Sequence, residues 1–118
     1  MQKILIIVHA PPYGSERCLS ALRLATALTG QNRERPEIRL FLMSDAVVVG
    51  LPNQVDGNGN GLQGMLELLV REGVAIKLCR TCAMARGLAD LPLLPGVSVG
   101  TLPELAEWTM AAEKVITF

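Results

Sequence analysis

Two kinds of hydrophobic pattern alternate along the chain. Short, nearly unbroken apolar runs occur at positions 3–8, 38–43, 74–78, 97–99 and 114–118. Between them, apolar residues recur every three or four positions at 16–28, 62–72 and 101–112, and a shorter helix is expected directly after position 78. An unbroken run rich in Ile and Val is typical of a strand buried on both faces, and the wider spacing is typical of an amphipathic helix. The pattern therefore predicts strands and helices in alternation.

The predicted helices have recognisable end signals. Ser15 is placed to cap the first helix, and Gly73 is placed to end the second. Thr101 and Glu104 have the spacing of a capping box at the start of the third long helix. Strands joined by helical crossovers pair in parallel. We therefore expect one α/β domain over residues 1–118, with a five-stranded parallel sheet and helices on both faces.

The composition argues against several classes of protein. Half of the 118 residues are apolar, which is enough for one packed core. Eleven basic and eleven acidic residues cancel, and no basic block is present, so nucleic acid is not an expected partner. The run at 3–8 is too short for a signal-peptide core or a membrane span, which predicts a cytoplasmic protein without a membrane partner. The Gly- and Asn-rich loop at 52–61 is expected to be mobile, or ordered by a neighbour or ligand.

Candidate site residues cluster at one predicted edge of the sheet. In open parallel sheets, ligands bind beyond the carboxyl ends of the strands. The loops that follow these ends contain His9, Ser15, Ser44, Asp45, Cys79, Thr81 and Cys82. Cys79 and Cys82 are the candidate catalytic residues, and the others, together with Arg86, are candidate binding residues.

Cys79 and Cys82 form a Cys-x-x-Cys motif where a strand ends and a small helix is expected to begin. Unpaired backbone N–H groups and the positive end of a helix dipole favour a thiolate at such a position. Arg80 and Arg86 add positive charge nearby in the sequence. We therefore expect an exposed, reactive sulfur on Cys79. The alternative is that both cysteines are small apolar side chains packed in the core.

Other chemistries have weaker support. A structural zinc site needs four ligands, and the remaining candidates are Cys18, His9 and Asp45, so no metal site is predicted. Packing is the expected role of Cys18, helix capping that of Asp45, and a loop contact that of His9, with acid–base chemistry as the alternative for His9. Gly14 and Ser15 suit an anion near a helix start, but no nucleotide-binding motif surrounds them. No cofactor is predicted.

Several segments match a known pattern in order and spacing. They are the start MQKILIIVHAPPYGSE, the run RLFLMSDAV, the segment KLCRTC, the Arg-Gly pair at 86–87 and the ending EKVITF. Together they resemble the DsrE/DsrF-like family, and in particular its YchN-type branch, over essentially the whole chain. The resemblance implies a three-layer α/β/α fold around a five-stranded parallel sheet and assembly into a homohexamer.

The resemblance also implies a chemistry. Sulfur-relay members of the family hold sulfur as a persulfide on a cysteine that stands eight residues before the glycine of an Arg-Gly pair. In this chain Cys79 stands eight residues before Gly87, which follows Arg86. The resemblance therefore implies that Cys79 carries sulfur from a donor protein to an acceptor protein. Cys82 has no counterpart in that spacing, although a paired cysteine is typical of the YchN-type branch.

Three functions stay open at this point. The first is intracellular sulfur relay through a persulfide on Cys79, which makes the protein a carrier, sulfurtransferase-like at most. The second is a non-catalytic, oligomeric binding or assembly module of the same fold. The third is thiol–disulfide exchange by Cys79 together with Cys82, which the chemistry of a Cys-x-x-Cys motif supports equally well.

Overall fold

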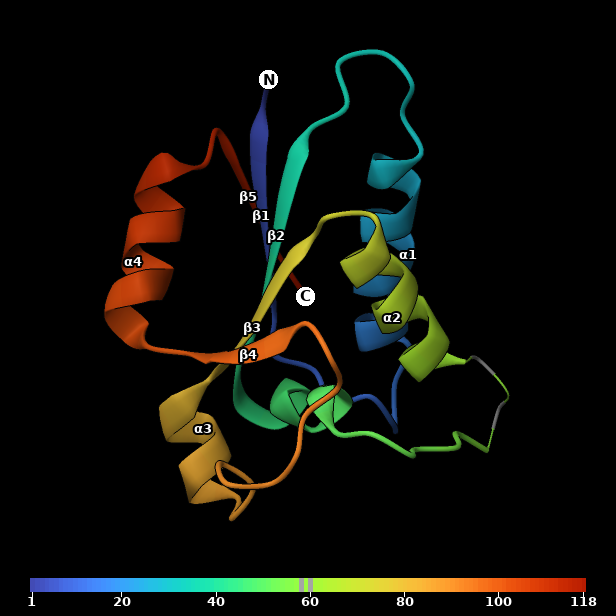
Figure 1. The fold of residues 1–118 in the computed structure, drawn as a ribbon, viewed down its shortest axis with the longest axis vertical. Helices are drawn as coiled ribbons and strands as arrows, with labels where there is room; N and C mark the ends of the chain where they lie inside the picture. The colour runs from blue at the N-terminus through green and yellow to red at the C-terminus, as the bar shows by residue number, and fades with distance from the viewer. Residues whose placement is uncertain (58, 60) are drawn as a thin grey trace.

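Five parallel strands form one sheet at the centre of the protein (Figure 1). The structure, a computed structural model, describes residues 1–57, 59 and 61–118. The strands are β1 (Lys3–Val8), β2 (Glu37–Leu42), β3 (Ala75–Cys79), β4 (Val97–Gly100) and β5 (Lys114–Thr117), in the spatial order β4-β3-β2-β1-β5. In the register of β1, Ile6 lies opposite Leu40 of β2 on one side and Ile116 of β5 on the other. The predicted five-stranded parallel sheet is confirmed, and every strand boundary lies within one residue of its predicted position.

Helices cover both faces of this sheet, which gives three layers. The helices α1 (Arg17–Thr29) and α2 (Leu62–Arg71) lie on one face, and α4 (Leu102–Ala111) lies on the other (Figure 1). The short helix α3 (Arg80–Ala85) and the 3-10 helix η1 (Ser44–Gly50) lie instead at the carboxyl end of the sheet, at the bottom of the view. Of the helices that the structure describes, none combines the length and apolar character needed to span a bilayer.

The ends of α2 and α4 follow from local sequence. Gly73 adopts a φ of 89°, and its backbone N–H donates to the Val70 carbonyl, so a glycine in the left-handed region closes α2. At the start of α4, the Thr101 side chain accepts a hydrogen bond from the Glu104 N–H, and the Glu104 side chain accepts one from the Thr101 N–H. Both helix-end predictions are confirmed.

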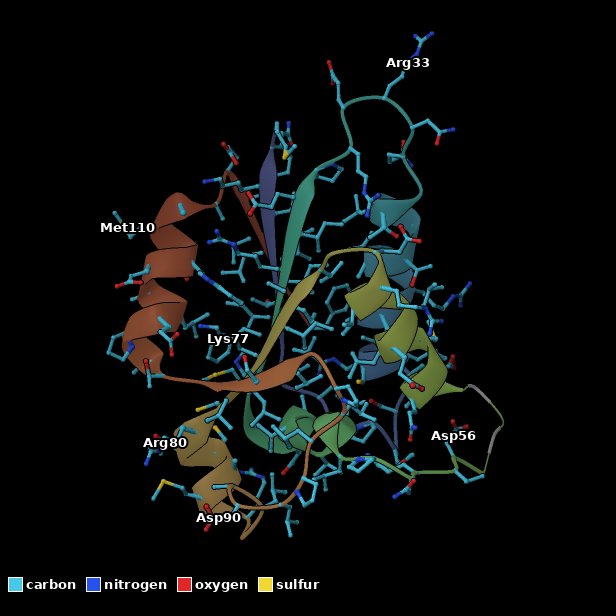
Figure 2. All side chains as sticks on the ribbon, viewed as in Figure 1. Arg33, Asp56, Lys77, Arg80, Asp90 and Met110 are labelled. Carbon is cyan, nitrogen blue, oxygen red and sulfur yellow. The ribbon has the colours of Figure 1, made fainter. Side chains whose placement is uncertain are left out.

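The two faces of the sheet differ in polarity. Side chains alternate along each strand, and the set that faces α1 and α2 is apolar and buried. On the opposite face, the Phe41 and Trp108 rings meet edge-on with their centroids 5.9 Å apart. The cationic groups of Arg39 and Lys77 each lie 5.2 Å from the centre of the same Trp108 ring. Lys77 also pairs with Glu104, so α4 is attached to the sheet by charge as well as by packing (Figure 2).

Two local details differ from the sequence prediction. The first helix begins at Arg17 with Glu16 at the N-cap position, so Ser15 is not the cap, although its Oγ accepts a 3.4 Å hydrogen bond from the Arg17 N–H. The segment after β2 forms η1, which apolar periodicity did not predict. In the loop at 52–61, Asn58 and Asn60 lie outside the described residues, so its predicted mobility stays a prediction.

Backbone hydrogen bonds join the carboxyl ends of the strands. The Met43 N–H donates to the Val8 carbonyl, and the His9 N–H donates to the Phe118 carbonyl, both at 2.8 Å. The turns after β1 and β2 therefore begin at the same level of the sheet. Because β2 also pairs with β3, this is the level at which β3 delivers Cys79.

Candidate functional site

Cys79 lies where β3 ends and α3 begins. Its backbone is extended, with φ of −66° and ψ of 121°, and it is the N-cap residue of α3. Its Sγ accepts a 3.4 Å hydrogen bond from the backbone N–H of Cys82. A cysteine sulfur thus occupies the position at which Ser, Thr, Asp or Asn usually caps a helix. The backbone holds this sulfur over the first turn of α3.

Burial opposes ionisation of the Cys79 thiol. The residue is 4% exposed, and desolvation raises the pKa of its thiol above the ordinary value. The backbone N–H groups of Cys82 and Thr81 lower this pKa, but they do not outweigh desolvation and the neighbouring Cys82 thiol together. The prediction of an exposed Cys79 with a favoured thiolate is therefore wrong for this protomer. The physical reason is that η1 packs against both α3 and β3, and α3, with six residues, has a small dipole.

Cys82 is the more accessible member of the pair. It is the third residue of α3 and is partly exposed, and both cysteines are free thiols. The neighbouring Cys82 thiol contributes to the raised pKa of Cys79, so the two side chains influence each other. The first cysteine of the motif is thus shielded and the second is open to solvent.

Arg86 joins α3 to η1. Its Nε donates to Asp45 Oδ1 at 3.0 Å, and its Nη2 lies 2.9 Å from the same oxygen. Its Nη1 donates to the Cys82 carbonyl at 3.0 Å, and its Nη2 lies 3.4 Å from Ser44 Oγ. We call this set, made of Arg86, Asp45, Ser44 and the Cys82 carbonyl, the Arg86 clamp. Asp45 is therefore an ion-pair partner rather than the predicted helix cap, since Met43 holds the N-cap position of η1.

The spacing of Cys79 and Gly87 corresponds to one short helix. Cys79 is the N-cap residue, Arg80–Ala85 form the helix, and Arg86 is the C-cap residue. Gly87 follows with a φ of 70°, and its N–H donates to the Met84 carbonyl at 3.1 Å. This is the pattern by which a left-handed glycine ends a helix. The eight-residue spacing therefore fixes the length of the helix that presents the cysteine pair and the position of its attachment to η1.

The other predicted binding residues lie outside the Arg86 clamp. Thr81 is exposed in the first turn of α3 and acts on the Cys79 sulfur through its backbone N–H. His9 is exposed directly after β1. Ser15 lines a hollow of about 430 Å³ before α1, together with Tyr13. The structure thus places Thr81, Arg86 and both cysteines on or next to α3, and Ser44 and Asp45 on η1, which Arg86 joins to α3. Ser15 lies elsewhere, in the hollow before α1.

Sequence reasoning missed a hollow on the outer side of α3. It measures about 410 Å³ and is lined by Arg80, Met84, Ala89, Asp90 and Val99. Figure 2 shows Arg80 and Asp90 at this end of the molecule. The sequence contains no clear signal for it, because the side of a six-residue helix that faces outward depends on how the helix is attached.

The third cysteine has a different environment. Cys18 is fully buried in α1, and desolvation raises the pKa of its thiol to about 11. This agrees with the packing role predicted from the sequence. Across the described parts of the chain, no three His, Cys, Asp or Glu side chains gather in positions to hold a metal ion.

Comparison with known proteins identifies the family of the chain. The DsrE/DsrF-like family model matches residues 2–118. Protein YchN of Escherichia coli (strain K12) is 52% identical over 118 residues, which cover 100% of both chains, and its crystal structure matches this fold with a TM-score of 0.94 over the same extent. The structure of MTH1491 from Methanobacterium thermoautotrophicum, at 18% identity, has a TM-score of 0.82 over 100% of both chains and supports the fold alone. The chain belongs to the DsrE/DsrF-like family.

Proposed function

We propose that this protein carries sulfur as a persulfide on Cys79, which it receives from a donor protein and passes to an acceptor thiol. Membership of the DsrE/DsrF-like family supports sulfur relay in general terms. The observation that carries the proposal is the placement of Cys79 as N-cap of a helix that Arg86 and Gly87 close eight residues later. This is the spacing that sulfur-relay members of the family use.

The chemistry needs one nucleophilic sulfur at each step. Cys79 attacks the outer sulfur of a donor persulfide as a thiolate, the donor's S–S bond breaks, and the donor leaves as a thiolate. The backbone N–H groups of Cys82 and Thr81 stabilise the negative charge on Cys79 during this exchange. An acceptor thiolate then attacks the same outer sulfur and releases Cys79. Because Cys79 is 4% exposed and its pKa is raised, loading requires a sulfur donor that is small enough, or docked closely enough, to reach the shielded sulfur.

Partners in this proposal include further copies of the chain, because the family resemblance implies a homohexamer. Leu102 is 63% exposed, Met110 is 87% exposed and Val115 is 42% exposed, which supports an assembly face on α4 and β5. Figure 2 shows Met110 on the outer side of α4. Light scattering measures the mass of the assembly, and a mass equal to that of one protomer would contradict this part of the proposal.

Intact-mass spectrometry tests persulfide formation. Cys82→Ser protein is reduced, incubated with inorganic polysulfide and freed of excess reagent. We expect the mass to rise by one sulfur atom, and peptide mapping to locate that atom on Cys79. The double variant Cys79→Ser/Cys82→Ser, shown to be folded by circular dichroism, is the matched control and should gain no sulfur. Sulfur on Cys18 alone, or an unchanged mass in folded Cys82→Ser protein, would contradict the proposal.

Thiol–disulfide exchange is the second candidate function. The hydrogen bond from the Cys82 N–H to Cys79 Sγ favours it, because it holds the two cysteines of a Cys-x-x-Cys motif close together. Equilibration in a glutathione redox buffer separates the two functions: exchange requires both thiols and no sulfur donor. If substitution of Cys79 or Cys82 changes neither persulfide formation nor disulfide formation, the non-catalytic binding module is the remaining function.

A further inference from the structure

Cys82 places a second thiol beside the sulfur that carries the proposed persulfide. Its backbone N–H donates to Cys79 Sγ at 3.4 Å, and its thiol is close enough to raise the pKa of Cys79. Cys82 is partly exposed, whereas Cys79 is 4% exposed. An acceptor thiol in solution therefore has to reach a shielded sulfur, while the Cys82 thiol already lies next to it.

The backbone around the pair is compatible with a disulfide bond. Residues three apart on a helix have Cβ atoms about 5–6 Å apart, and a disulfide needs its Cβ atoms about 3.5–4.5 Å apart. Arg86 bonds to the Cys82 carbonyl and Gly87 ends the helix, so α3 is held in this register. Closing the bond therefore requires the two Cβ atoms to approach by about 1–2 Å at the first turn of α3, together with rotation of the side chains.

We propose that Cys82 resolves the persulfide on Cys79 and releases sulfide; this inference rests on the proposed function. The Cys82 thiolate attacks the inner sulfur on Cys79, an S–S bond forms between the two cysteines, and the bond to the outer sulfur breaks. The outer sulfur leaves with the bonding electron pair and is protonated, so one persulfide and one thiol give one disulfide and one hydrogen sulfide. The outer sulfur gains the two electrons that the cysteine thiols lose. An external dithiol then reduces the disulfide by attack at the accessible Cys82.

Cys82 thereby decides what happens to the bound sulfur. An intramolecular thiol reacts at a high effective concentration, so resolution is faster than transfer to a free thiol in solution. Only an acceptor that docks at α3 competes with it. Cys18 does not share this role, because it is fully buried and burial raises the pKa of its thiol to about 11. The protein is thus a sulfur carrier when an acceptor is docked and a persulfide reductase when none is.

Sulfide release after loading tests the inference. Reduced wild-type protein and the Cys82→Ser, Cys82→Ala and Cys18→Ser variants are loaded with inorganic polysulfide and desalted. Hydrogen sulfide is then followed over time, and intact mass is recorded. For wild type and Cys18→Ser, we expect sulfide equivalent to the protomer and a final mass lower by two hydrogen atoms. For both Cys82 variants, we expect retained sulfur on Cys79 and sulfide release at least about tenfold slower.

The outcomes separate this inference from the function on which it rests. If wild type retains sulfur on Cys79 as long as Cys82→Ser does, the resolving role is overturned and the carrier function stands. If neither Cys82 variant acquires sulfur while folded, both are overturned. If Cys79→Ser protein holds the sulfur on Cys82, the assigned direction of the reaction is overturned, because Cys82 is then the loading thiol.

Discussion

Two cysteines of this protein start helices at the same edge of the sheet and have different surroundings. Cys18 lies in the first turn of α1, and Cys79 caps α3. Both are buried, at 0% and 4% exposed. At Cys18, desolvation alone raises the pKa of the thiol, to about 11. At Cys79, desolvation is opposed by two backbone N–H groups, and a second thiol, that of Cys82, adds to the raised pKa.

The comparison shows that a position at a helix start does not by itself make a cysteine reactive. At the start of α1 the side chain of Cys18 belongs to the apolar core, and the N-cap residue Glu16 makes no side-chain capping bond. At the start of α3 the sulfur is itself the capping acceptor. The neighbouring groups that face a thiol, rather than its place along the helix, therefore set its chemistry.

The largest expected difference between the two regions is in alkylation rate. Desolvation raises the pKa of Cys18 from its ordinary value of 9.0 to about 11, so at about pH 8 its thiolate fraction is about 100-fold below that of an ordinary cysteine. We expect iodoacetamide to modify Cys82 in the native protein at least about 100-fold faster than Cys18. Peptide mass spectrometry measures both rates, and denaturant should remove the difference.

The pH dependence of this labelling has a definite sign. A raised thiol pKa keeps Cys18 protonated until the pH approaches about 11, so its labelling continues to accelerate where an ordinary cysteine with a pKa of 9.0 has levelled off. Rapid labelling of Cys18 in folded protein near neutral pH would show that α1 does not shield it. The predicted difference in alkylation rate between Cys18 and the cysteine pair at α3 would then be wrong.

A smaller effect is expected when the end of α3 is disturbed. Gly87→Ala places a side chain at φ of 70°, which costs about 1–2 kcal/mol of unfolding free energy. The same substitution at Gly64, an exposed position inside α2 with open space around it, should raise stability by about 0.5–1 kcal/mol. Denaturant unfolding measures both. Because Gly87 fixes the register of α3, iodoacetamide should also modify Cys79 faster in the Gly87→Ala variant than in the wild type. An unchanged rate would mean that α3 is held by the Arg86 clamp alone.

Much of the fold could be predicted because its signals are local. The run at 3–8 is apolar enough to identify a strand buried on both faces, and the spacing of Thr101 and Glu104 is by itself enough to predict a capping box. The error at Ser15 is a shift of one residue in the start of α1, because the helix begins at Arg17 and not at Glu16. A sequence pattern locates a helix end only to within one or two residues. The 3-10 helix η1 escaped prediction, because its apolar run has no helical period and its position depends on contacts with β3 and α3.

The candidate site was only partly predictable. The Cys-x-x-Cys motif and the Arg-Gly pair are visible in sequence, and they identify the correct helix. The burial of Cys79 is not visible, because it arises from η1, about 30 residues earlier in the chain, packing on the edge of the sheet. The ion pair between Arg86 and Asp45 joins residues 41 positions apart and is invisible to any local pattern. Sequence thus located the thiols and misjudged their exposure.

The smallest expected effect compares Ser with Ala at each of the two buried cysteines. At Cys79 a Ser Oγ accepts the same hydrogen bond from the Cys82 N–H and an Ala does not, so Cys79→Ser should be more stable than Cys79→Ala by about 0.5–1 kcal/mol. At Cys18 the order should reverse by a similar amount, because Ser buries a hydroxyl in the apolar core. Urea unfolding midpoints at constant slope measure both differences. If both sites prefer the same residue, the Cys79 sulfur is not acting as a helix cap, and the difference between the two regions rests on the second thiol alone.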